Sequence, residues 1–92
     1  MKPLALIVHN QLSDRPTEDE NDVMAQIEAV GASLVRLGWR REKLALTLDL
    51  AQGRSRIKAR SPDCIVNLVE SLDGDDRFIS AAPLLYESLH LP

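Results

Sequence analysis

Apolar residues follow different spacings along the chain, and each spacing predicts one kind of element. The continuous apolar run Leu4–Val8 follows Pro3 and is typical of a strand that is buried on both faces of a sheet. The run Cys64–Val69 follows Pro62, is rich in residues that favour strands, and predicts a central parallel strand. Leucine at every second position of 43–50 predicts a third strand, nearer the sheet edge, with one less buried face.

The segment after Thr17 has the pattern of an amphipathic helix. Thr17 and Glu20 have the spacing of a capping box, in which each side chain accepts a hydrogen bond from a backbone N–H at the helix start. Apolar residues then recur at spacings of three and four and form one stripe: Val23, Ile27, Val30, Leu34 and Leu37. Gly38 ends the predicted helix, and Gly31 within it indicates close packing against the sheet.

Two further segments carry weaker patterns. Residues 49–60 predict a short helix or an irregular crossover, because Gly53 interrupts them and few positions are apolar. The segment that starts at Phe78 has helical spacing with Pro83 inside it, which predicts a kink or a second helical piece that begins at Pro83. His9 to Thr17 is rich in loop-forming residues and predicts a long loop.

The order of these elements predicts one α/β domain over residues 1–92. Strand, helix, strand, crossover, strand and helix follow one another, as in a three-layer fold with about three parallel strands joined by crossover helices. Three strands are few for an independent sheet of this kind. We therefore expect the chain to be a fragment or a truncated N-terminal domain of a longer protein.

Composition and charge exclude several classes of function. A net charge of −3 and only three aromatic residues argue against nucleic acid and anionic lipid as partners. A single cysteine, Cys64, excludes an intrachain disulfide and a cysteine-based zinc site. No apolar stretch is long enough for a membrane span, and the first residues do not form a signal peptide, so we expect a cytoplasmic protein with no membrane partner.

The predicted central strand and the residues that follow it point to a known family. Pro62, Asp63, Val66 and Asn67 form a Pro-Asp-apolar-Asn strand, an acidic turn contains Gly74 and Asp75, and the last two residues are Leu91-Pro92. With these motifs the chain resembles the N-terminal, pre-ATP-grasp domain of D-alanine-D-alanine ligases and related ATP-grasp enzymes. The element order agrees over nearly the whole chain, and the residue-level match is concentrated in 62–92. The resemblance implies a Rossmann-like fold.

The resemblance also implies an activity for a longer protein. Such a ligase joins a carboxylate to an amine through an acyl phosphate made from ATP. Central and C-terminal domains bind ATP and magnesium, and both would be partners that these 92 residues do not contain. We therefore expect no cofactor, no metal and no catalytic residue in this chain, which would be inactive alone.

By the same resemblance, two loops of this domain contribute to the pocket of a small, amino-acid-like substrate. Glu20 is the nearest match to the glutamate that holds the substrate ammonium in these ligases, although their Gly-Gly is absent here. Asn67 and Glu70 belong to the second loop, and Glu70 takes the place of a histidine of the family. A carboxylate at position 70 can still pair with an ammonium group, while D-alanine itself is not implied.

Each of these features also has a structural explanation. Glu20 is accounted for by the capping box, and Asn67 by a side-chain hydrogen bond to the turn that follows it. The acidic residues 73–76 suit a helix start better than a cation site, because the spacing of a calcium loop is missing. The basic series Arg54, Arg56, Lys58 and Arg60 suits a solvated helix face better than a phosphate site.

A second class of function stays open at this point. A sheet of three strands has exposed edges, so a free-standing module that associates with itself, for instance as a homodimer, is the alternative to the ligase domain. A phosphoacceptor receiver domain has the same fold class, but it needs acidic residues where this chain has His9 and Asn10.

Overall fold

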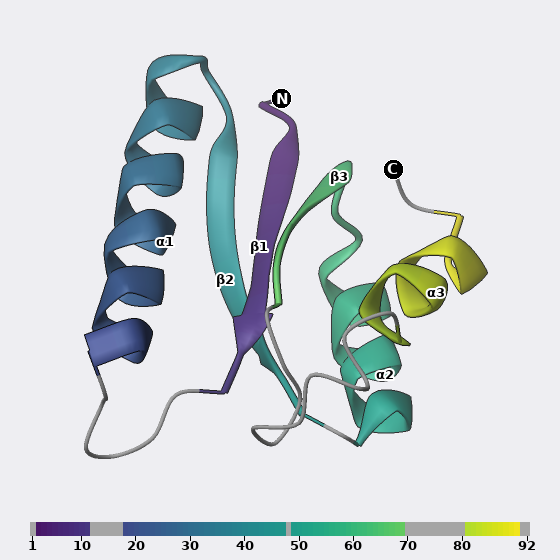
Figure 1. Cartoon of the computed structure of the whole chain (residues 1–92). Coiled ribbons are helices and arrows are strands. Elements are labelled where there is room, and N and C mark those ends of the chain that lie inside the picture. The colour runs from purple at the N-terminus through teal and green to yellow at the C-terminus, as the bar shows by residue number, and fades with distance from the viewer. Residues whose placement is uncertain (1, 12–17, 48, 70–80, 91–92) are drawn as a thin grey trace.

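The structure is a computed structural model that describes residues 2–11, 18–47, 49–69 and 81–90. Its elements follow the predicted order along the chain (Figure 1). They are β1 (Leu4–Asn10), α1 (Glu18–Arg36), β2 (Arg40–Leu46), α2 (Leu50–Arg60), β3 (Cys64–Leu68) and α3 (Ala81–Ser88). The chain is thus a small α/β fold with a parallel sheet of three strands in the described residues.

The strand order is β2-β1-β3, so β1 lies in the centre of the sheet. β1 pairs with both other strands, and its residues Leu4–Val8 are almost completely buried. The predicted central position of Cys64–Val69 was wrong, because β3 lies at an edge and four of its five residues are only half-buried. An apolar run indicates that helices cover a strand's faces, but it does not report whether both of its edges are paired.

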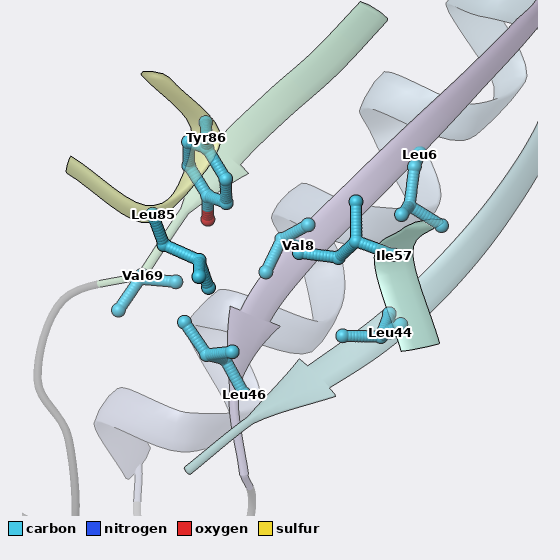
Figure 2. Close-up of a cluster of buried hydrophobic side chains, with 8 residues drawn as sticks. All are labelled: Leu6, Val8, Leu44, Leu46, Ile57, Val69, Leu85 and Tyr86. Atoms are coloured by element: carbon cyan, nitrogen blue, oxygen red, sulfur yellow. The ribbon is translucent and has the colours of Figure 1, made fainter. Parts of the chain in front are cut away.

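Helices lie on both faces of the sheet (Figure 1). On one face, Ile7 of β1 packs against Val23 and Ile27 of α1. On the other face, α2 and α3 close the larger cluster of buried side chains that Figure 2 shows. This larger cluster consists of Leu6, Val8, Leu44, Leu46, Ile57, Val69, Leu85 and Tyr86. Successive side chains of β1 therefore point to opposite faces of the sheet and pack into different clusters, because side chains alternate along a strand.

α1 begins and ends close to its predicted limits. Gly38 has a φ of 86°, and the N–H groups of Gly38 and Trp39 donate to the carbonyls of Val35 and Leu34, which together form a Schellman motif. The predicted stripe is correct through Leu34, but Leu37 is 74% exposed. Leu37 directly follows the last residue of α1 and lies in the turn that leads to β2.

Gly31 is buried against the sheet, as its place in the helix predicted. A Cβ atom at this position would overlap the guanidinium group of Arg41 on β2. The glycine thus leaves the space in which the Arg41 side chain lies across α1.

β2 ends earlier than predicted. It stops at Leu46, and Asp49 then caps α2, because its Oδ1 accepts a hydrogen bond of 3.1 Å from the N–H of Gln52. Leu48 lies outside the described residues, and Leu50 begins the helix. The spacing of leucine at every second position thus continued by coincidence past the true end of the strand. Of the two forms predicted for the next segment, residues 50–60 adopt the helix and not the irregular crossover.

Pro83 does not break the last helix. It is the third residue of α3. In the first turn of a helix the backbone N–H groups have no acceptor within the helix, so proline, which lacks an N–H, costs no hydrogen bond there. Phe78 and Ile79 lie outside the described residues, so the first part of that predicted pattern stays a prediction. None of the helices in the described ranges is long and apolar enough to cross a membrane.

Candidate functional site

The carboxyl ends of β1 and β3 lie side by side. Val8 is opposite Asn67 and His9 is opposite Leu68 in the register of the two parallel strands. α1 begins at the same end of the sheet, at the bottom of the view in Figure 1. His9 and Asn10 were predicted to be loop residues, but they extend β1 to this end. Ligands of open α/β sheets bind outside the carboxyl ends of the strands, so this is where a site is expected.

Asn67 lies on β3 at this end, and its side chain is held by two donors. Its Oδ1 accepts a hydrogen bond of 3.3 Å from the N–H of Val69 and one of 3.0 Å from the hydroxyl of Tyr86. Because a backbone N–H can only donate, the contact with Val69 assigns the oxygen of the amide. The Nδ2 group makes no hydrogen bond within the described residues, and the residue is exposed. Asn67 therefore links the end of β3 to α3 through its side-chain oxygen.

Tyr86 of α3 is part of the site's support, and the sequence patterns had not singled it out. It is 7% exposed and belongs to the buried cluster of Figure 2. Burial raises the pKa of its hydroxyl well above the ordinary value, so the group stays protonated and donates to Asn67. A signal was present, because Tyr86 lies four residues after Ala82 and three before Leu89, which are apolar positions of the helical pattern that starts at Phe78.

Glu20 lies in the first turn of α1, at the end of the sheet where β1 and β3 finish, and is half-buried. Its predicted capping partner, Thr17, lies outside the described residues, and so does Glu70. The structure therefore brings Glu20 and Asn67 to the same end of the sheet, while the place of Glu70 in the site stays a prediction.

Asp63, another residue of the family resemblance, has a structural role at the opposite end of the sheet. Its Oδ2 accepts a hydrogen bond of 2.7 Å from the N–H of Leu4, and its own N–H donates to the Leu4 carbonyl at 2.8 Å. This reciprocal pair holds the start of β3 against the start of β1. The neighbouring Cys64 is half-buried, and burial, together with the charge of Asp63, raises the pKa of its thiol. Cys64 is thus a weak nucleophile.

The described residues contain no group of three His, Cys, Asp or Glu side chains that could hold a metal ion. The acidic positions 73–76 lie outside these residues. The basic series on α2 is exposed, as predicted, and three of its members make contacts within the domain. Arg54 donates to Ser88 Oγ at 3.4 Å, Arg56 donates to the Ala45 carbonyl at 3.4 Å, and Arg60 pairs with Glu42. The basic residues of α2 therefore resemble a solvated helix face rather than a phosphate site.

No protein-family model matches this chain, and comparisons with curated proteins and with solved structures find no match either.

Proposed function

We propose that this chain is the Rossmann-like, substrate-side domain of an ATP-grasp carboxylate-amine ligase similar to the D-alanine-D-alanine ligases. One observation carries the proposal: β1 and β3 are parallel neighbours. The two loops that would line the substrate pocket therefore leave the same end of the sheet side by side. A chain in which β2 separated these strands would hold the two loops apart. The predicted residues Glu20 and Asn67 lie at this shared end.

The donors and acceptors of this end suit a small zwitterion. With its oxygen occupied by Val69 and Tyr86, Asn67 would use its Nδ2 group to donate to a substrate carboxylate or carbonyl. The carboxylates of Glu20 and Glu70 would pair with the substrate ammonium. These are orienting roles, so the chain would position one substrate rather than perform the chemistry.

The remaining steps would belong to further domains. ATP bound there would supply the phosphoryl group that converts the substrate carboxylate into an acyl phosphate. The amine of the second substrate would then attack the carbonyl carbon, and phosphate would leave as the new amide bond forms.

Calorimetric titration of two proteins tests this proposal. One is the 92-residue chain, and the other is a longer reading frame that continues past Pro92. The expected result is that the longer protein binds magnesium-ATP and releases phosphate with one member of a panel of D- and L-amino acids, while the 92 residues bind no ATP. ATP binding by the 92 residues alone would contradict the proposal, and so would a gene that ends at Pro92.

A matched pair of variants of the longer protein tests the site itself. Asn67→Ala is expected to raise the KM for the first substrate about tenfold or more, since a hydrogen bond to a charged group contributes about 1.5 to 3 kcal/mol. Gln26→Ala changes an exposed amide in the middle of α1 and should leave the KM unchanged. Equal effects of both substitutions would remove Asn67 from the pocket.

We propose self-association through β3 as the second candidate. Among the described residues only β1 pairs with β3, and β3 carries half-buried apolar residues on both faces, with Ile65 beside the larger cluster and Val66 beside α1. β2 is the poorer edge for two copies, because Arg41 and Lys43 would bring like charges together. Sedimentation over a wide concentration range tests this candidate, and a strict monomer would exclude it. A dimer should be abolished by Val66→Lys and kept by Lys58→Glu on α2.

A further inference from the structure

A groove runs between α1 and β2, and its lining includes neither Glu20 nor Asn67. Its larger part has a volume of about 240 Å³ and its smaller part about 100 Å³, and both parts share Ile27, Glu28 and Lys43 as lining residues. The larger part extends to Ile7 and Arg41, and the smaller part extends to Met24 and His9. The groove thus follows the direction of β2 along the side of the domain that α1 covers.

The groove has an apolar floor and a charged rim. Ile7 and Ile27 are buried beneath it, and Met24 is partly exposed at its side. On the rim, Arg41 and Lys43 share a single carboxylate, that of Glu28, at 3.9 Å and 3.6 Å. The other acidic residue of the lining, Glu42, is paired with Arg60. Two cations therefore face one available carboxylate, on a chain whose net charge is −3.

The contacts of the two cations leave most of their donors unused. Both distances to Glu28 are too long for hydrogen bonds, and neither side chain makes a hydrogen bond within the described residues. The Arg41 guanidinium lies against α1 in the space that Gly31 leaves, and the Arg41 side chain is 40% exposed. Such a glycine costs the helix about 1 kcal/mol relative to alanine. A guanidinium with free donors matches the two oxygens of a carboxylate.

From this combination we propose that the groove binds a short aliphatic carboxylic acid. Its carboxylate replaces Glu28 between Arg41 and Lys43, and its hydrocarbon chain lies on Ile7, Ile27 and Met24. A monoanion fits better than a doubly charged phosphate, because Glu28 remains nearby and repels added negative charge. This inference does not rest on the proposed ligase function, since it uses none of the residues of the substrate site.

Titration of the ¹⁵N-labelled 92-residue chain with hexanoate, followed by NMR, tests the proposal. We expect saturable shifts of the amides of Gly31, Arg41 and Lys43. Acetate carries the charge without the chain, and 1-hexanol carries the chain without the charge, so both should bind at least about tenfold more weakly. Acetate or 1-hexanol binding as tightly as hexanoate would overturn the proposal, as would tighter binding of inorganic phosphate.

Charge variants separate a built site from general electrostatics. Arg41→Gln and Lys43→Gln should each weaken hexanoate binding about tenfold. Arg54→Gln makes the same change in charge on α2 and should alter binding by less than about twofold. Glu28→Gln should strengthen binding, because it removes the competing carboxylate, and Gly31→Ala should weaken it by displacing Arg41. Equal losses in Arg41→Gln and Arg54→Gln, or weaker binding in Glu28→Gln, would refute the site. A dispersed spectrum of each variant confirms that it is folded.

Discussion

The hydrogen bond between Tyr86 and Asn67 joins α3 to the end of β3, and its strength can be measured. Tyr86→Phe removes one donor at 3.0 Å from a ring that is almost fully buried. Asn67 Oδ1 keeps its bond to Val69, and the residue is exposed, so no buried acceptor is left without a partner. The expected loss in the free energy of unfolding is therefore that of one neutral hydrogen bond, about 1 kcal/mol.

Asn67→Ala should cost more than Tyr86→Phe, although Asn67 is the more exposed residue. It removes the bonds to both Val69 and Tyr86 and leaves the buried hydroxyl of Tyr86 without an acceptor. An unsatisfied buried group adds a desolvation cost, so we expect a loss of about 2 to 3 kcal/mol. When position 86 is already phenylalanine, Asn67→Ala should cost about 1 kcal/mol less, which is the coupling of the pair.

Urea denaturation followed by far-UV circular dichroism measures all four proteins of this double-mutant cycle. In a domain of this size, 1 kcal/mol corresponds to about 4 to 8 °C in Tm, which gives an independent readout. Gln52→Ala, an exposed amide on α2, is the control and should change stability by less than about 0.5 kcal/mol. A coupling near zero, or a Tyr86→Phe variant more stable than the wild type, would refute the bond as the link between α3 and β3.

Three further perturbations have expected outcomes. Burial raises the pKa of Tyr86, so the stability that its protonated form contributes is complete below about pH 10 and decreases above it. The decrease is up to about 1.4 kcal/mol per pH unit. Urea titrations across this range should show this loss in the wild type and not in Tyr86→Phe. Gly38→Ala should cost about 1 to 2 kcal/mol from its positive φ alone, since nothing lies near the added Cβ, and an unchanged Tm would contradict the left-handed cap. Ile57→Ala empties a fully buried position of α2 and should cost about 2 to 5 kcal/mol, whereas the exposed Lys58→Ala should cost under about 0.5 kcal/mol; similar losses would be inconsistent with the packing of α2 on the sheet.

The sequence patterns predicted which helices and strands form better than they predicted where a strand lies in the sheet and where it ends. β1 and α1 were placed within one or two residues, because a fully buried strand and a single apolar stripe leave few alternatives. The edge position of β3 was missed, since Cys64–Leu68 forms an apolar run like that of β1, although within the described ranges only one edge of β3 is paired. The end of β2 was missed because Leu48 and Leu50 continue the leucine pattern into a capped helix.

The candidate site was only partly predictable for a related reason. Asn67 was found from its place at a strand end. Its partner Tyr86 is 19 positions away in the sequence, and the two residues meet only because α3 packs beside β3. Likewise, Gly31 indicated close packing against the sheet, while the identity of its neighbour, Arg41, depends on where β2 begins. Contacts between elements depend on register, which a single sequence does not state.

The central position of β1 has a consequence for how the protein is made. β1 is the first strand to leave the ribosome, yet its edge partners arrive much later, and Leu4 and its contact Asp63 are 59 positions apart. At the usual rate of translation, β2 and β3 are synthesised on the order of several seconds after β1, and until then the edges of β1 cannot both be paired. During that interval the nascent chain exposes its most aggregation-prone segment. The acidic start of α1 follows β1 after residues 11–17 and places charge near this apolar run in the sequence.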